Sequence, residues 1–144
     1  DMGVDFAAED FNAKLKTGLE YMIANEGPYL VHCNEGKDRA GFVSALLEAL
    51  MGGTVAEIKA DYMTPYENYY HVEKGSEQYE KIAESNIMNS LRTIAGAEEG
   101  ADLAGVDLQA AAETYLTKTV GLSAEQVDAI QAVLSGAAEE KQAA

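Results

Sequence analysis

The sequence predicts the C-terminal, mostly helical portion of an α/β protein, with one core parallel strand that leads into a loop and a helix. Apolar residues recur at helical spacing through most of the 144 residues, and only residues 29–32 (YLVH) form a short apolar run of strand type. A parallel strand cannot satisfy its backbone groups alone. We therefore expect the other strands upstream, in an N-terminal part of the same protein, or in another polypeptide.

Length and composition predict one soluble domain over residues 1–144. The chain is 47% hydrophobic and carries 10 basic against 25 acidic residues, a net charge of −15. The absence of basic clusters makes nucleic acid an improbable partner. No apolar run approaches the roughly 20 residues that cross a bilayer, so no membrane span is expected. The single cysteine, Cys33, excludes an internal disulfide and a multi-cysteine zinc site.

The ends of the chain carry two expectations. The chain opens on Asp1-Met2-Gly3 without an initiator methionine, so we expect an upstream part, and localisation stays open between cytoplasmic and secreted. Residues 137–144 (AAEEKQAA) have the composition of a frayed natural C-terminus.

The first elements follow from periodicity and from stop signals. Residues 8–25 predict an amphipathic helix that ends at NEGP, before the strand at 29–32. Residues 41–51 (GFVSALLEALM) are almost continuously apolar and predict a core helix, which Gly52-Gly53 terminates.

A short helix and irregular turns are expected next. Thr54 begins a capping box, and its helix continues to about Asp61, which is expected to orient the loop before the core helix or to cap a helix. Residues 62–70 (YMTPYENYY) are expected to form irregular turns, because Pro65 breaks a continuous helix. Core packing is favoured for their tyrosines over stacking on a substrate. His71 has no partner at a metal-ligand spacing and is expected to be an ordinary surface or turn residue.

The second half predicts helices throughout. Gly75-Ser76 caps a long helix of imperfect periodicity that extends to about Ala95. Residues 96–105 (GAEEGADLAG) form an acidic loop. Residues 108–120 and 123–134 form a closing helical hairpin. The expected organisation is a helix, strand, loop and helices in 1–96, and the C-terminal hairpin in 97–144.

Residues 31–41 (VHCNEGKDRAG) join the strand to the core helix and predict an anion-binding loop. Such a unit directs backbone N–H groups and a positive helix end at one point. Gly36 and Gly41 suit it, because glycine lets the backbone approach a ligand closely. The planar guanidinium of Arg39 can bind two phosphate oxygens, and Lys37 adds a second positive charge.

Cys33 lies at the mouth of this loop, where the helix end and nearby cations lower a thiol pKa from about 8.5. The thiolate would attack phosphorus, form a phosphocysteine and release an alcohol that a general acid protonates; water would then complete hydrolysis. No metal or other cofactor is required, because Arg39 and the amides supply the charge stabilisation.

The segment HCNEGKDRAG resembles the His-Cys-x5-Arg signature loop of the protein tyrosine phosphatase superfamily. Its Gly-Lys-Asp-Arg core is similar to the atypical bacterial branch with tyrosine and phosphoinositide phosphatase activity. The similarity extends through residues 41–50, through ADYM at 60–63 and into the closing helices. It implies the C-terminal, mostly helical portion of a cysteine-phosphatase fold. It also implies a phosphorylated protein or a phosphoinositide as the substrate.

The resemblance also implies roles for the loop residues. Cys33 corresponds to the nucleophile, Arg39 binds phosphate, and His32 tunes the cysteine from behind. Asp38 resembles the general acid, although its cationic neighbours favour the ionised carboxylate, and an upstream residue is the alternative. Gly36 shapes the loop. The substrate-binding positions are Asn34, Glu35, Gly36, Lys37, Ala40 and Gly41.

Two positions depart from expectation. The family usually places Thr or Ser where this chain has Ala40, and loss of that hydroxyl predicts slower breakdown of the phosphocysteine without loss of the attack. Glu35 adds a negative charge at the rim, which would repel a polyanionic inositol phosphate or would hydrogen-bond away from the site.

Three functions remain in competition. The first is a cysteine-dependent phosphatase acting on phosphate monoesters, and the second is a weak or inactive phosphate-binding pseudophosphatase. The third is sulfur transfer by a rhodanese-like loop, which the order Lys37-Asp38-Arg39 matches less well. The acidic charge argues mildly against docking on anionic membranes.

Overall fold

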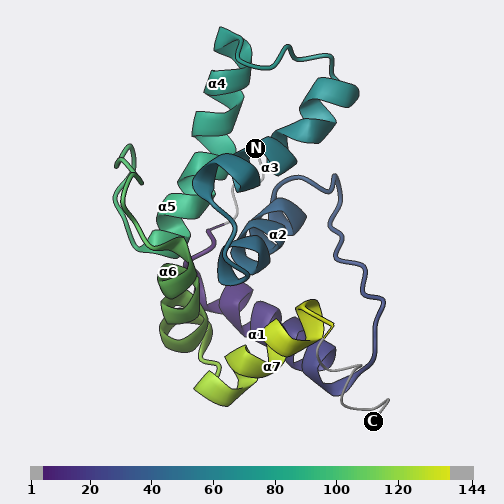
Figure 1. Cartoon of the computed structure of the whole chain (residues 1–144). Coiled ribbons are helices and arrows are strands. Elements are labelled where there is room, and N and C mark those ends of the chain that lie inside the picture. The colour runs from purple at the N-terminus through teal and green to yellow at the C-terminus, as the bar shows by residue number, and fades with distance from the viewer. Residues whose placement is uncertain (1–4, 137–144) are drawn as a thin grey trace. The chain divides into compact units, whose positions relative to one another are not determined.

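The computed structural model describes residues 5–136, and the expectations for residues 1–3 and 137–144 lie outside them. Helices make up all regular structure in the described part (Figure 1). The chain divides into two compact units. One contains the described residues up to Leu30 and from Glu113 onward, and the other contains Val31–Ala112.

The unit formed by the two ends of the chain packs α1 (Glu9–Ala24) against η2 (Tyr115–Val120) and α7 (Ala124–Leu134). The capping box at Ser123 confirms the predicted start of α7. Its core contains large aliphatic residues, which in α1 and α7 recur every three or four positions. These are Leu15, Leu19, Met22, Leu116, Val127 and Ile130.

A buried polar pair also holds this unit together. The Tyr115 hydroxyl donates a hydrogen bond to Asn12 Oδ1 (2.9 Å), and Asn12 Nδ2 donates to the Phe6 carbonyl (3.0 Å). Burial raises the pKa of Tyr115 to about 12. The pair is fully hydrogen-bonded, which removes most of the cost of burying an amide.

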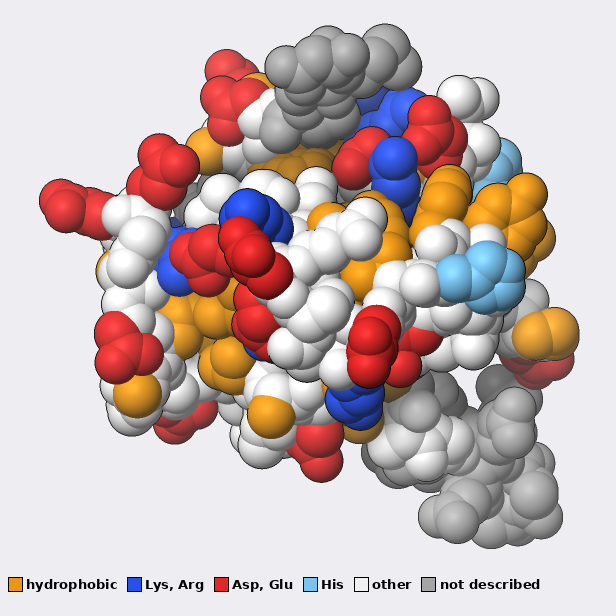
Figure 2. Space-filling view, turned by 90° about the horizontal axis from the view of Figure 1, so that it is seen from above, with side chains coloured by type: hydrophobic (Ala, Val, Ile, Leu, Met, Phe, Trp, Pro, Cys, Tyr) orange, Lys and Arg blue, Asp and Glu red, His pale blue; other side chains and the backbone are white. Residues whose placement is uncertain are grey.

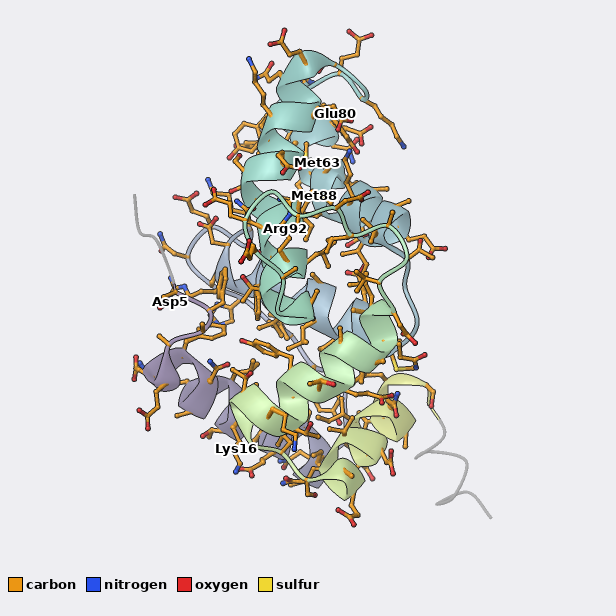
Figure 3. The ribbon with its side chains drawn as sticks, turned by 90° about the vertical axis from the view of Figure 1, so that its left-hand side faces the viewer. Asp5, Lys16, Met63, Glu80, Met88 and Arg92 are labelled. Carbon is orange, nitrogen blue, oxygen red and sulfur yellow. The ribbon has the colours of Figure 1, made fainter. Side chains whose placement is uncertain are left out.

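The second unit contains α2 (Arg39–Leu50), α3 (Val55–Asn68) and a long helix composed of α4 (Glu77–Ala83), η1 (Glu84–Met88) and α5 (Asn89–Ala95). Helix α2 packs against α3, η1 and α5, and α3 packs against α4 and η1. Figure 3 follows Glu80, Met88 and Arg92 along the long helix, with Met63 of α3 beside it. The largest fully buried side chains here are Phe42, Leu46, Leu50, Ile58, Met63, Ile87 and Leu91.

The expected caps of this unit are confirmed. Thr54 forms its capping box with Glu57, and the Ser76 hydroxyl accepts a hydrogen bond from the Tyr79 amide. The π-helical segment η1 explains the imperfect periodicity of residues 76–95, because it adds a residue to one turn. Helix α6 (Leu108–Thr114) begins in this unit and continues into η2, as the predicted helix over 108–120 requires.

The expected core strand is not found. The described residues contain no strand, and Tyr29–His32 form an irregular extended segment in which Leu30 is 86% exposed. The described residues give this segment no strand to pair with, and a single strand has no ladder of hydrogen bonds.

Pro65 does not end a helix, so that prediction is wrong. Helix α3 continues through Pro65 to Asn68. The missing amide affects only the carbonyl one turn earlier, and buried Met63 together with the contact between the Tyr62 and Tyr66 rings (5.9 Å) holds the helix across it. After α3, His71 is exposed and adopts φ 55°, and the Val72 amide donates a hydrogen bond to the Tyr66 carbonyl. The prediction of an ordinary surface or turn residue is confirmed by this exposure.

Candidate active site

The loop predicted to bind an anion lies in the second unit, between the extended segment and the N-terminus of α2. Asp38 precedes the first turn, and its carbonyl accepts a hydrogen bond from the Phe42 amide (2.9 Å). Gly36 has φ +75°, a left-handed backbone conformation that residues other than glycine adopt only with strain. The chain bends over residues 34–38, and α2 then begins at Arg39 and Ala40.

The Cys33 thiol is partly buried inside this turn, surrounded by backbone amides. Burial alone raises the pKa of Cys33, but hydrogen bonds from the amides outweigh it and leave the pKa below its ordinary value. The amides belong to Ala40, Gly36, Glu35 and Arg39. The loop thus brings four N–H groups to the sulfur and favours its thiolate form.

The charged side chains of the loop are arranged at its surface. Glu35 Oε2 and Lys37 Nζ form an ion pair at 2.7 Å, and each lies on the solvent side. The hydrogen bond with Lys37, and then its charge, lowers the pKa of Glu35, and the same contact raises the pKa of Lys37. Glu35 was expected either to repel a polyanionic substrate or to hydrogen-bond away from the site. In the structure its carboxylate pairs with Lys37 of the same loop and neutralises that charge.

The remaining predicted site residues differ in accessibility. Ala40 is buried, at 7% exposure, whereas the side chains of Asp38 and Arg39 are exposed at the start of α2. Asp38 makes no side-chain cap hydrogen bond to α2, so its carboxylate is not engaged by the helix. His32 and Asn34 are exposed as well.

Tyr62 of α3 supports the loop, a role that the sequence did not reveal. A Cβ placed on Gly41 would lie 2.7 Å from Tyr62 Cε2, so the ring occupies the space that any side chain at position 41 would need. Burial first, then a hydrogen bond with Tyr66 and the charge of Asp38, raises the pKa of Tyr62 far above its ordinary range. The only sequence feature that points to Tyr62 is its position in ADYM (residues 60–63), directly after Asp61.

Asp61 instead interacts with another carboxyl group. It is hydrogen-bonded to Glu48 of α2, and burial, followed by the charge of Asp61, raises the pKa of Glu48 to about 7. Asp61 therefore joins α2 to α3 and does not cap a helix, so the expectation of a cap is wrong.

The described residues contain no group of three His, Cys, Asp or Glu side chains suited to a metal ion. Within the same residues, no helix has the length and apolar character needed to span a membrane.

Comparison with known families places this loop in context. The sequence profile of the tyrosine phosphatase family matches residues 4–136, which include the whole loop and all the described helices. No curated protein and no solved structure matches the chain. Because the match covers nearly the full length, the chain belongs to the tyrosine phosphatase family.

Proposed function

We propose that the chain hydrolyses phosphate monoesters with Cys33 as the nucleophile and no metal ion. Family membership supports a phosphatase hydrolase with a phosphorylated substrate. The observation that carries the cysteine mechanism is the set of four backbone amides that lower the pKa of Cys33. A thiolate held by amides at the start of a helix is the arrangement that favours attack on an anionic phosphate.

The proposed reaction has two steps. The Cys33 thiolate forms a bond to phosphorus while the ester P–O bond breaks, and Asp38 protonates the leaving oxygen. A water molecule then attacks the phosphocysteine, gives its proton to Asp38, and releases inorganic phosphate and the thiolate. Arg39 binds the equatorial phosphate oxygens in both steps.

Asp38 is proposed as the general acid because it is exposed beside the loop and no helix cap engages its carboxylate. His32 is proposed to tune Cys33. Lys37 is proposed to assist phosphate binding once it leaves Glu35. We assign the chain to the atypical bacterial branch on its Gly-Lys-Asp-Arg core, with phosphotyrosine proteins and phosphoinositides as the substrate classes.

The test is hydrolysis of a chromogenic aryl phosphate in the presence of a metal chelator. The wild-type chain is expected to turn over, and Cys33→Ser is expected to lose activity while keeping its circular dichroism spectrum and its affinity for inorganic phosphate. Activity that survives in Cys33→Ser would exclude the cysteine mechanism.

The alternative, a pseudophosphatase, is favoured by Ala40, which places a methyl group where the family usually has a hydroxyl. A rapid-mixing experiment separates the two functions. A burst of alcohol equal to the enzyme concentration, followed by slow turnover that Ala40→Ser accelerates, supports a phosphatase limited by phosphocysteine breakdown. Phosphate binding without a burst or turnover supports the pseudophosphatase.

A further inference from the structure

A ladder of tyrosine rings leads away from the loop along α3. Neighbouring ring centroids are 5.9 Å apart between Tyr62 and Tyr66, and 5.6 Å apart between Tyr66 and Tyr70. Tyr69 then meets Tyr70 edge to face, with centroids at 5.1 Å and an interplanar angle of 78°. We define these four rings as the tyrosine ladder. The spacing of Tyr62 and Tyr66 follows from the helix, because residues four apart lie on one face. Tyr69 and Tyr70 follow the last residue of α3, Asn68, and extend the row beyond the helix.

The inner end of the ladder lies beside the loop. Tyr62 occupies the space beside Gly41, as described above. After the dominant effect of Glu35, the nearby Tyr66 also raises the pKa of Lys37. The ladder therefore begins at the residues that would surround a bound phosphate.

The outer end of the ladder is exposed. Tyr69 is 78% and Tyr70 58% exposed, so the prediction that these tyrosines pack in the core is wrong for both. Tyr62 and Tyr66 are only partly buried. Exposed aromatic rings in a row are costly in water and are typical of surfaces that contact a partner.

The charged residues near the tyrosine ladder indicate which side chains would bind to it. Residues 60–73 contain Asp61, Glu67 and Glu73 but no Lys or Arg. Lys59 precedes them and is paired with Glu80 (2.6 Å), and Lys74 follows. Figure 2 shows acidic side chains spread over the face seen from above, as the net charge of −15 requires. The faces of tyrosine rings attract cations. An arginine or lysine side chain is the partner that both features favour.

The outer rings of the tyrosine ladder lie within reach of a peptide that is bound at the loop. The two centroid steps place Tyr70 at most about 12 Å from Tyr62, which three to four residues of extended peptide would span. A peptide whose phosphorylated residue lies beside Tyr62, next to Gly41, would thus reach Tyr69 and Tyr70 with residues three or four positions away.

We infer that the tyrosine ladder binds the flanking residues of a phosphotyrosine peptide and selects substrates with basic side chains three to four positions from the phosphate. This inference rests on the proposed phosphatase function, which it narrows to a class of protein substrate. A phosphoinositide has no such flanking side chains and would gain nothing from the outer rings.

The test compares two phosphotyrosine peptides that carry either Arg or Glu at the third and fourth positions on both sides. For each variant, kcat/KM is divided by the value for a small chromogenic aryl phosphate. We expect wild type to prefer the Arg peptide, and Tyr69→Ala/Tyr70→Ala to reduce this preference about fivefold. The aromatic replacements Tyr69→Phe/Tyr70→Phe keep the ring faces and should retain most of the preference.

A matched control tests whether the loss of any exposed tyrosine has the same effect. Tyr21 on α1 is 63% exposed and lies outside the ladder, so Tyr21→Ala should keep the wild-type preference. An unchanged preference in Tyr69→Ala/Tyr70→Ala would overturn the inference. A loss restricted to phosphoinositide vesicles, with peptide selectivity intact, would overturn it in favour of a lipid surface. Failure of the aryl phosphate reaction itself would instead contradict the proposed function.

Discussion

The ring of Tyr62 lies so close to Gly41 that a Cβ at position 41 would be 2.7 Å from Tyr62 Cε2. Gly41→Ala must therefore displace the ring and its hydrogen bond with Tyr66. We expect a loss of about 1–3 kcal/mol in the free energy of unfolding, measured in urea, together with slower alkylation of Cys33.

Gly18 of α1 is the matched control for this substitution, because a Cβ there would meet nothing within 4 Å. Gly18→Ala should stabilise the chain by about 0.5–1 kcal/mol, since alanine favours the helix interior. Equal effects of the two substitutions would show that Tyr62 does not fill the space beside the loop.

The second prediction concerns the ionisation of Cys33. Since the amides of the loop lower its pKa, the pH profile of its alkylation by iodoacetamide should reach half-maximum below the value of about 8.5 for a free thiol. In denaturant, the same chain should return to the ordinary profile. If the native and denatured profiles coincide, the loop does not lower the pKa of Cys33. Inorganic phosphate should slow alkylation of Cys33 in the native chain but not in the denatured chain.

The third prediction uses the ion pair between Glu35 and Lys37. Glu35→Gln removes the carboxylate that engages the lysine and repels anions. The variant is expected to bind inorganic phosphate about twofold to fivefold more tightly, measured by protection of Cys33 from alkylation. The control, Glu98→Gln, removes an exposed charge from the loop at residues 96–105. If it raises the affinity for phosphate equally, the effect of Glu35→Gln comes from the change in net charge and not from the ion pair.

Local signals predicted most of the helices. Capping at Thr54, Ser76 and Ser123 depends on side chains within three residues, so the sequence alone carries it. The strand at residues 29–32 failed for the opposite reason, because a strand needs a neighbour and the described residues supply none.

The site was predictable in part, for the same reason. The residues of the predicted signature loop are contiguous, so their spacing can be read directly from the sequence. The support that Tyr62 gives to Gly41, and the bond between Glu48 and Asp61, depend on how α2 packs against α3. No local pattern encodes that packing. The exposure of Tyr69 likewise depends on where α3 ends. The helix was expected to end at about Asp61, but it continues to Asn68.

The fourth prediction follows from the carboxyl pair. Burial and Asp61 raise the pKa of Glu48 to about 7 in the folded chain, above the value of about 4.3 expected when unfolded. The folded state thus holds the proton more tightly, and stability falls as pH rises from about 4.3 through about 7. Glu48→Gln keeps a neutral partner for Asp61 and should lose this dependence.

The measurement is urea unfolding at pH 5 and pH 8. With allowance for solvent screening of a half-buried group, Glu48→Gln should be about 1–2 kcal/mol more stable than wild type at pH 8, with a smaller difference at pH 5. Glu113→Gln changes an exposed carboxylate and should follow the wild-type pH dependence. The same gain at both pH values would argue against a shared proton.

The last prediction concerns Arg92, which is 6% exposed at the junction of the long helix and the loop at residues 96–105. Its Nε donates to the Ala101 carbonyl (2.9 Å), and its Nη1 donates to Asn89 Oδ1 (2.9 Å) and pairs with Glu84 Oε1 (2.6 Å). Arg92→Met keeps much of the volume but leaves these acceptors without their donor. We expect a loss of about 2–4 kcal/mol on urea unfolding and faster amide exchange across residues 96–105.

Lys81 provides the contrast, because its ion pair with Glu77 has the same 2.6 Å distance but is exposed on both sides. Lys81→Met should cost less than about 0.5 kcal/mol, since water already solvates both charges. Burial, and not the ion-pair distance, would then account for the difference between the two substitutions. If both substitutions lower the free energy of unfolding by similar amounts, the effect of Arg92→Met comes from removing a charge. Arg92 would then not anchor the loop at residues 96–105.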